Sequence, residues 1–235
     1  MKAKRMQGLL VVALAALLLS GCAATGSNPK DPNEGFNRAM FNVNEGLDTV
    51  VAKPLAKGYD AAVPLPVKAS VGNFFGNVGD AWVGINNGLQ GKPGRGANDI
   101  GRLLINSTVG ILGLFDVASE MGMPKHEEDF GQTLAVWGVG DGPYVFLPII
   151  GPRTTRDTFG WMVDEAVDPV WWGIDNMAVR NSAAALRFVD IRASLLPADK
   201  VVEEAALDKY AYIRDAYLQR RRSQIFDGRP PKQDE

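Results

Sequence analysis

The sequence predicts a mostly helical, single-domain fold, and three observations lead to this prediction. Long stretches carry apolar residues three and four positions apart, the period of an α-helix, whereas few stretches alternate with the period of two typical of strands. The 235 residues are 46% apolar, which can fill one sizeable core, and they contain no internal repeat. Glycine accounts for 26 residues, above its usual share of ~7%, which indicates many tight turns and close backbone approaches.

Residues 1–21 have the pattern of a lipoprotein signal peptide. Three basic residues lie within the first five positions. An uncharged apolar run at residues 8–19 follows them and is too short for an ordinary membrane-spanning helix. Ser-Gly-Cys at residues 20–22 completes a lipobox, so we expect cleavage before Cys22 and acylation of its thiol.

Cys22 is the only cysteine, so no disulfide can form within the chain. A structural cysteine is the alternative interpretation, but its position in the lipobox favours a lipid anchor. Several acyl chains anchor a protein stably, at about 0.8 kcal/mol per buried methylene. Ala23 follows the cysteine, which resembles lipoproteins exported to the outer membrane; the inner membrane is the alternative. We expect residues 22–30 to form a tether.

The charge of the chain limits its partners. Without residues 1–21 the chain has 22 basic and 27 acidic residues, a net charge of −5. This weakly acidic balance is not that of a nucleic-acid-binding protein. We therefore expect no nucleic-acid partner.

The first helix is predicted to begin at Asp31, interpreted as its N-cap, with Pro32 and Glu34 in the first turn. Apolar residues spaced by three and four predict one buried stripe: Phe36, Met40, Val43, Leu47 and Val50. Pro54 is expected to end this helix.

Two further helical segments and a long apolar stretch follow. Pro64 and Pro66 are predicted to start a second helix, and a third segment is predicted to end near Gly91. Residues 91–96 predict a turn. Residues 97–115 are almost uniformly apolar, which predicts a helix that is buried on every side or touches lipid.

Residues 130–152 form an apolar belt that carries a single charge, Asp141. Five glycines and three prolines interrupt the belt, so it cannot form the continuous helix that crosses a bilayer. Irregular backbone cannot face lipid, because its unpaired amides and carbonyls are costly there. We therefore expect other elements to enclose the belt, either along a cavity or as an ordinary buried loop in the core of a soluble protein.

The last third of the chain is also predicted to be helical. Thr154 or Thr155 can cap one helix, and another is expected to end near Ser194. The tandem Trp171 and Trp172 fit a membrane interface and a protein core equally well.

Residues 199–222 predict one more helix, with three aromatic or aliphatic residues on one face: Tyr210, Ile213 and Tyr217. Arg220, Arg221 and Arg222 lie at its C-terminal end, where they favour the helix dipole. The predicted helical domain spans residues 31–226, and residues 227–235 are predicted to form a polar tail without fixed structure.

Catalytic patterns are weak in this chain. His126 is the only histidine, and no Gly-x-Ser-x-Gly elbow is present, so a serine hydrolase would need an unusual base. His126 with the acidic residues 127–129 could bind a metal, but adjacent charges in a loop favour a solvated turn. Asp164 and Asp168 are interpreted as surface groups. The sequence predicts no enzyme, no metal and no cofactor.

The glycines at 138, 140 and 142 do not indicate a nucleotide site. No clear helix follows them, and Pro143 disrupts the arrangement of amides that binds an anion.

Seven short motifs occur in a fixed order: residues 31–38 (DPNEGFNR), 73–77 (NFFGN), 89–92 (LQGK), 106–110 (NSTVG), 128–134 (EDFGQTL), 137–140 (WGVG) and 142–144 (GPY). Together they resemble the signatures of the VacJ/MlaA family of outer-membrane lipoproteins, and the lipobox agrees with them independently. Seven ordered motifs are far more specific than any one of them. The last 40 residues resemble the family only loosely.

The resemblance implies a ring-like helical bundle, with irregular Gly/Pro-rich apolar loops, that encloses an amphipathic channel in the outer membrane. It implies that phospholipids which have strayed into the outer leaflet pass through this channel to a soluble periplasmic carrier, and that trimeric porins lie beside the ring. Residues of the apolar belt are the candidates for lining the passage: Trp137, Gly138, Gly140, Gly142, Tyr144 and Phe146. A lipid-cleaving hydrolase and a structural lipoprotein that scaffolds a porin are the alternatives.

Overall fold

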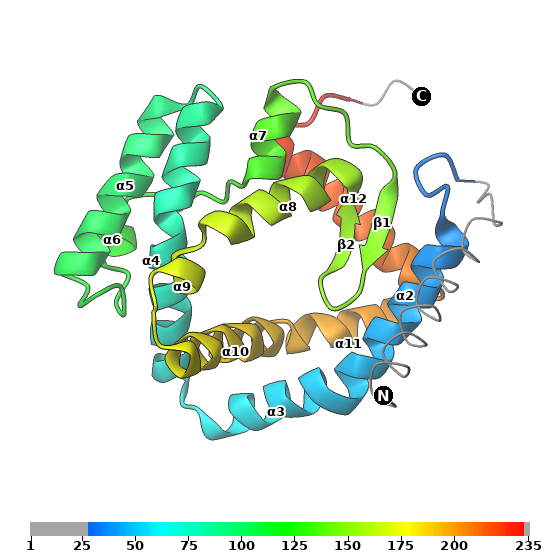
Figure 1. The fold of residues 1–235 in the computed structure, drawn as a ribbon, viewed down its shortest axis with the longest axis horizontal. Helices are drawn as coiled ribbons and strands as arrows, with labels where there is room; N and C mark the ends of the chain where they lie inside the picture. Colours follow the sequence, from blue (N-terminus) through cyan, green and yellow to red (C-terminus); the bar gives the residue numbers. More distant parts are fainter. Residues whose placement is uncertain (1–27, 233–235) are drawn as a thin grey trace, which may run out of the picture.

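The computed structural model describes residues 28–232, and within them the chain is mostly helical, as predicted (Figure 1). The elements in chain order are α2 (Glu34–Leu47), the π-helix η2 (Asp48–Ala52), α3 (Lys53–Ala62), α4 (Leu65–Leu89), α5 (Pro93–Thr108), α6 (Val117–Glu120), α7 (Phe130–Val136), β1 (Tyr144–Leu147), β2 (Gly151–Thr154), α8 (Thr155–Val167), α9 (Pro169–Trp172), α10 (Met177–Ser194), α11 (Leu196–Ala205) and α12 (Lys209–Ile225). The predicted signal peptide and Cys22 lie outside the described residues.

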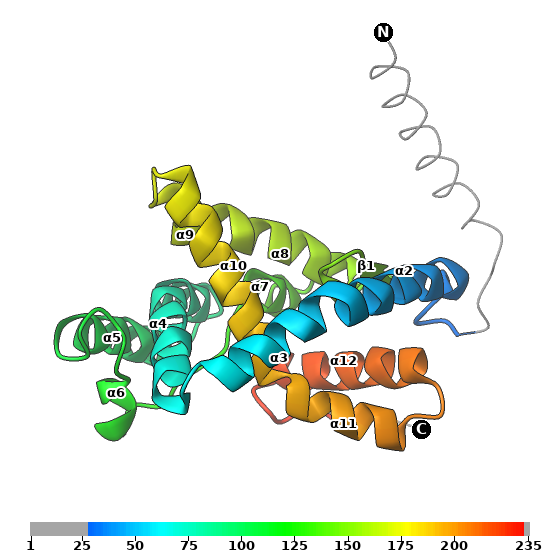
Figure 2. The ribbon, with the colours of Figure 1, turned by 90° about the horizontal axis from the view of Figure 1, so that it is seen from below.

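The helices are arranged as a ring, which confirms the predicted architecture. In Figure 1, α2 with α3, α4, α8 with α9, and the β1–β2 hairpin surround a central opening between the ribbons, and α10 with α11 runs along its lower side. The helices α5 and α6 lie outside the ring, beside α4. Figure 2 shows α8 and α9 on one side of the ring and α11 and α12 on the other. Among the described residues, no helix is both long and apolar enough to cross a bilayer.

The prediction that Pro54 ends the first helix is wrong. Helical backbone continues from α2 through η2 into α3, and Pro54 lies in the first turn of α3. A proline is tolerated in a first turn, where its missing N–H is not needed. The N–H of Lys53 bonds to the carbonyl of Asp48, the longer spacing of a π turn, so the chain widens directly before the proline ring.

The helix α4 joins two segments that were predicted to be separate. It runs without interruption from Leu65 to Leu89, and its start agrees with the prediction. The predicted turn at 91–96 is shorter than expected, because Pro93 already begins α5. Gly91 has a φ of 75°, a conformation that glycine adopts without steric cost, and it reverses the chain between the two helices.

The predicted burial of the apolar residues in α5 is wrong, because the polar face of this helix is the buried one. Asp99, Arg102 and Asn106 face inward, whereas Leu104 is 60% exposed. Arg102 is completely buried and makes hydrogen bonds to Asp116 at 2.8 and 3.0 Å, so its charge is matched. The apolar residues therefore form the outer surface of α5, which leaves the lipid-facing alternative open.

The stripe predicted to be buried on the first helix is wrong in its C-terminal half, whereas Met40 packs against the aromatic core as predicted. Val43, Leu47 and Val50 are exposed. Asn37 takes the inward position: its amide donates to the carbonyl of Tyr144 at 3.1 Å and accepts from the N–H of Phe146 at 2.9 Å. The polar side of α2 therefore faces β1, because the buried N–H and C=O groups of the β1 backbone need hydrogen-bond partners.

Asp31 is not the N-cap of α2. The helix begins after Asn33, whose side chain makes no capping bond. Asp31 is completely buried, and it accepts hydrogen bonds from Asn37, Tyr210 and Arg214. Its carboxylate therefore joins the start of α2 to α12.

A small aromatic core connects α2, the β hairpin and α12. Its members are buried: Phe41, Tyr144, Phe146 and Tyr210. Phe41 meets Phe146 edge to face with ring centroids 5.5 Å apart, and it meets Tyr210 at 5.8 Å. The predicted inward face of the last helix is confirmed, because Ile213 and Tyr217 pack against this core.

The predicted helix over residues 199–222 is two helices, α11 and α12. Residues 206–208 separate them, and the side chain of Asp208 caps α12 by accepting from the N–H of Ala211. Predicted tail residue Asp227 forms ion pairs with Lys92 and Arg95, so the ordered fold extends past residue 226. Elsewhere, Thr154 caps α8, and α10 ends at Ser194, as predicted.

The apolar belt is only partly enclosed. Its first part forms α7, and residues 137–143 form an exposed loop. Residues 144–154 follow this loop and include the antiparallel pair of β1 and β2. Tyr144 and Phe146 are buried, but Trp137 is 54% exposed. The expectation of full enclosure is therefore wrong for the loop. Trp171 is exposed, which agrees with an interface rather than a core.

Candidate functional site

Three adjoining cavities lie along α4, two of them also along α10, and we call the three together the inner groove. A cavity of about 810 Å³ lies between α3, α4, α10 and α11, and it shares Gly72 and Asp190 with a second cavity of about 420 Å³. The second cavity shares Phe75, Gly79 and Val83 with a third of about 190 Å³ beside α8 and α9. The inner groove therefore extends along most of α4.

Small residues keep the α4 side of the groove open. Gly72, Gly76 and Gly79 follow one another at spacings of four and three, so they share one helix face. A Cβ atom at Gly79 would meet no atom within 4 Å, which means that its helix face opens onto free space. Phe75 and Ile191 add apolar surface, so the groove is amphipathic.

The groove walls carry many charged side chains. Lys53 pairs with Asp199 at 3.3 Å and with Glu203 at 2.9 Å. Lys68 pairs with Asp60 at 2.5 Å. Wall charges of this kind suit the polar part of an amphipathic ligand, while the glycine-rich face can accommodate its apolar part.

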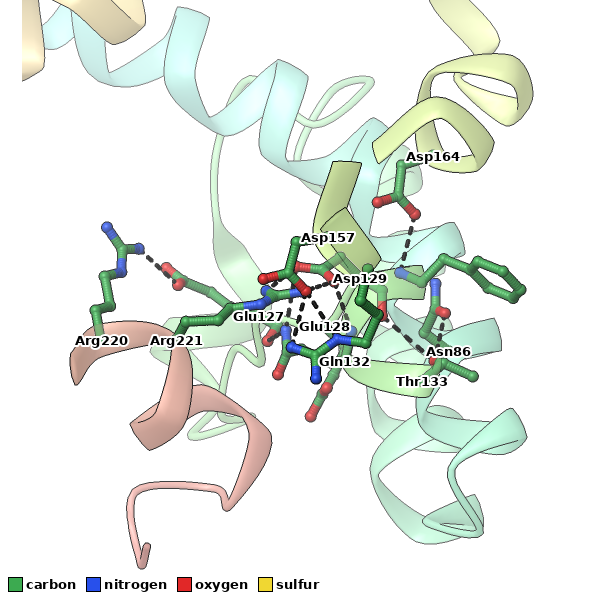
Figure 3. Close-up of polar contacts among 12 residues, drawn as sticks. Asn86, Glu127, Glu128, Asp129, Gln132, Thr133, Asp157, Asp164, Arg220 and Arg221 are labelled. Atoms are coloured by element: carbon green, nitrogen blue, oxygen red, sulfur yellow. Dashed lines mark hydrogen bonds and ion pairs between the residues drawn. The ribbon is translucent and has the colours of Figure 1, made fainter. Parts of the chain in front are cut away.

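A buried ionic cluster holds one end of the groove together (Figure 3). Arg221 of α12 contacts Asp129 through two nitrogens, at 2.5 and 2.7 Å, and Asp157 of α8 at 3.0 Å. Tyr217 donates a hydrogen bond of 2.6 Å to the second oxygen of Asp157. One guanidinium therefore joins α12 to the start of α7 and to α8.

The pKa values of the two carboxyls reflect this arrangement. Burial by itself would raise the pKa of Asp129, but the hydrogen bonds and the positive charge of Arg221 outweigh burial and lower it. Burial opposes the same shift in Asp157, and the charge of Arg221 with the Tyr217 hydroxyl again lowers its pKa. The sequence analysis assigned Arg221 only to the helix dipole and missed this role, in which its side chain is buried between these two acids.

The acidic segment before α7 is not a solvated turn. Glu128 is buried and accepts a hydrogen bond of 2.8 Å from Gln90, and Asp129 caps α7 by accepting from the N–H of Gln132. His126 lies 2.8 Å from Asp99 through Nδ1. These side chains turn to different neighbours, and residues 28–232 contain no group of three His, Cys, Asp or Glu side chains that could hold a metal.

Asp164 and Asp168 are not simple surface groups either. Asp164 accepts from the indole of Trp82 at 2.6 Å and from the N–H of Phe130 at 3.0 Å, and burial raises its pKa. Asp168 caps α9 and pairs with Arg187. Both carboxylates therefore fix the elements around the third cavity.

The structure does not bring the six passage candidates together. Gly140, Gly142 and Tyr144 line a separate cavity of about 560 Å³ beside α12. Trp137 donates from its indole to the carbonyl of Leu89 at 3.0 Å, at the surface. Phe146 lies in the aromatic core.

Gly138 has a φ of 90° in the exposed loop. None of the six candidates is among the described residues that line the inner groove.

Sequence reasoning missed the groove residues. The glycines of α4 recur at helical spacing, and that spacing was the available signal. The acidic and basic side chains of α3, α10 and α11 gave no comparable signal, because ordinary surface helices carry the same residues.

The chain was compared with known families and structures. The MlaA lipoprotein family matches residues 29–224. The intermembrane phospholipid transport system lipoprotein MlaA of Escherichia coli (strain K12) is 38% identical over 220 residues, which cover 90% of this chain and 86% of the relative. The protein of the same name in Haemophilus influenzae is 30% identical over 236 residues, which cover 94% of this chain and 91% of the relative.

A solved structure, published as "Structural basis for maintenance of bacterial outer membrane lipid asymmetry", has the same fold. Its TM-score against this chain is 0.72 at 32% sequence identity, and the match covers 85% of this chain and 99% of that one. The agreement extends over the helical ring as well as the sequence motifs. On these grounds the chain belongs to the MlaA lipoprotein family.

Proposed function

We propose that this protein is an outer-membrane lipoprotein that removes mislocalised phospholipids from the outer leaflet and passes them to a soluble periplasmic carrier. The observation that carries the proposal is the inverted distribution of side chains. Polar groups fill much of the interior, large apolar side chains cover the outside, and an amphipathic groove runs along α4.

The outer surface supports placement in a bilayer. Leu104, Ile111 and Leu112 are all more than half exposed on or just after α5, and Val50 and Leu55 are equally exposed on η2 and α3. An exposed apolar surface of this extent is unusual for a soluble monomer, and it matches the hydrocarbon of a membrane. Acylation of Cys22 would anchor the chain to the same membrane.

The inner groove supports phospholipid as the cargo. A phospholipid has a charged headgroup and apolar acyl chains, and the groove offers charged walls beside Phe75, Val83 and Ile191. The names of the relatives from Escherichia coli and Haemophilus influenzae describe intermembrane phospholipid transport. Lipid movement through such a groove requires no covalent chemistry, so we propose a transport protein and not an enzyme.

The loop and hairpin remain part of the proposal as a second wall of the passage. The β hairpin lies at the ring opening in Figure 1, and the loop before it supplies Trp137, Gly138, Gly140 and Gly142. Exposed apolar side chains here and on α5 offer surfaces for membrane partners, and we propose trimeric porins and the periplasmic carrier as those partners.

A blocked groove tests this function. Gly79→Leu places a bulky side chain in the groove, where a Cβ meets nothing within 4 Å. Gly88→Leu is the matched control, because a Cβ there is equally free but Gly88 does not line the groove. In a deletion strain, we expect the control to restore outer-leaflet lipid clearance and Gly79→Leu to fail at equal abundance.

The measurement is surface-exposed phospholipid, scored by labelling or by outer-leaflet phospholipase products. Normal clearance by a well-expressed Gly79→Leu protein would contradict transport through the groove. Fatty acid released by the purified protein would instead support a hydrolase. Unchanged outer-leaflet lipid in the deletion strain, together with co-purification of the wild-type protein with a porin, would support a scaffold.

A further inference from the structure

The charged side chains that line the two larger cavities of the inner groove are nearly all paired. The pairs include Lys125 with Asp80 at 2.6 Å, Lys68 with Asp60, and Arg187 with Asp168. Three lining residues differ from the rest. Within the described residues, no oppositely charged group lies within 4.0 Å of Asp190, Lys57 or Lys200.

One carboxylate oxygen of Asp190 accepts a hydrogen bond, and the other has no hydrogen-bond partner among the described residues. The hydroxyl of Tyr59 donates to Oδ1 at 2.8 Å, which fixes the carboxylate on the half-buried face of α10. A Cβ atom at Gly72 would lie 3.7 Å from Oδ2, so this oxygen faces the glycine side of the groove. The carboxylate lies where the two larger cavities meet, because it lines both of them.

Lys57 and Lys200 provide the opposite charge in the same cavity. Lys57 belongs to α3 and Lys200 to α11, so the two ammonium groups come from different walls of the cavity of about 810 Å³. Both side chains are exposed and long, and they can reach a phosphate that enters between the walls. The cavity thus presents two free cations and one free anion.

We propose that the inner groove recognises a zwitterionic phospholipid whose headgroup carries a primary ammonium, with Asp190 binding the ammonium and Lys57 and Lys200 binding the phosphate. This inference rests on the proposed function and specifies its cargo. A primary ammonium has N–H groups that can bond to the free Oδ2, whereas a trimethylammonium has none and a glycerol headgroup has no positive charge. Phosphatidylethanolamine has the required chemistry.

The test compares headgroups on the purified, lipidated full-length protein in detergent. Short-chain phosphatidylethanolamine, phosphatidylcholine and phosphatidylglycerol are titrated separately, and bound lipid is counted by native mass spectrometry. We expect the wild type to bind phosphatidylethanolamine roughly fivefold more tightly than phosphatidylglycerol, the size expected for one partly solvated ion pair. Asp190→Asn keeps the acceptor for Tyr59 and the side-chain volume, and it should abolish the preference.

Asp60→Asn is the matched control. It removes the same charge from the same cavity, but Asp60 is already paired with Lys68, so the preference should persist. The double substitution Lys57→Ala with Lys200→Ala should weaken the binding of all three lipids to a similar extent. The ratio of their affinities should stay unchanged. A comparable loss of preference in Asp60→Asn and Asp190→Asn would overturn the assignment.

The outcomes separate this inference from the proposed function. Equal affinity of the wild type for all three lipids would reject headgroup recognition and leave phospholipid transport intact. Absence of binding for every lipid would count against both. A preference that survives in Asp190→Asn would reject the role of this carboxylate.

Discussion

Arg221 is the residue that joins two acids, the buried Asp157 and the partly exposed Asp129. It neutralises Asp129 and Asp157 at distances of 2.5 to 3.0 Å, between three helices that are far apart in the sequence. Removing one partner from a buried ion pair leaves an uncompensated charge, and this is far more costly than losing an exposed pair. The conformation of this end of the ring therefore depends on one side chain.

Arg221→Met is expected to lower the free energy of unfolding by about 3 kcal/mol, the low end for breaking a buried ion pair, because Asp129 loses its cation while Asp157 keeps Arg156 at 2.9 Å. Arg220→Met is the control: Arg220 is 71% exposed, and among residues 28–232 it pairs only with the similarly exposed Glu127. Its effect should stay within about 0.5 kcal/mol. Denaturant unfolding in detergent, followed by circular dichroism, measures both. Equal effects of the two substitutions would contradict this assignment.

Asp116 gives the protein a defined dependence on pH. Burial by itself would raise its pKa, but hydrogen bonds from Ser119, Asn106 and Arg102 outweigh burial and lower the pKa to about 2. A lowered pKa in the folded state means that the ionised form stabilises the fold. This contribution is present above the ordinary value of 3.8 and is lost as pH falls towards 2.

We expect the unfolding free energy to fall by about 2 kcal/mol over this pH window through Asp116 alone. Asp116→Asn should lower stability at neutral pH and remove this part of the pH dependence. The measurement is denaturant unfolding at a series of pH values. An identical slope below pH ~4 in wild type and variant would show that other groups cause the acid sensitivity.

At the level of elements, α4 and α5 pack with their backbones unusually close. A Cβ atom at Gly96 would lie 2.7 Å from the carbonyl oxygen of Gly84, and a Cβ atom at Gly84 would lie 3.1 Å from the carbonyl oxygen of Gly96. A backbone carbonyl cannot move aside as a side chain can, so an added Cβ atom would push one helix away from the other. The two glycines therefore set the distance between α4 and α5.

Gly96→Ala is expected to destabilise the protein by about 1–3 kcal/mol, the usual cost of overpacking. Gly94→Ala, two positions earlier in the same helix, meets no atom within 4 Å and should be neutral or stabilise α5 by up to about 1 kcal/mol. Thermal unfolding of the two variants distinguishes them. A neutral Gly96→Ala would mean that the helices separate at little cost.

At the level of the whole molecule, we propose that a lipid anchor at Cys22 determines where the ring is located. If Cys22 is acylated, Cys22→Ala should leave the signal peptide uncleaved by the lipoprotein peptidase and should keep the protein away from the outer membrane. Fractionation and intact mass check both outcomes. An unmodified Cys22 in the mature wild-type protein would contradict the lipoprotein assignment.

The sequence by itself determined the helical class, several element boundaries and the family. The spacing of apolar residues is a local property, and so are the start of α4 at the prolines, the threonine cap of α8 and the inward face of α12. The ordered motifs determined the family, and the family implied the ring. These features need no knowledge of which segments meet in space.

Only the tertiary structure decided which side of α2 and of α5 faces inward. Periodicity identifies an apolar stripe on the first helix but not its direction, and the assumption that apolar means buried failed for Val43 of α2 and for Leu104 of α5. Asn37, Arg102 and Arg221 became interior residues because their partners lie on distant segments: β1, Asp116 and Asp129. The inner groove was unpredictable for the same reason, since it exists only where α3, α4, α10 and α11 come together.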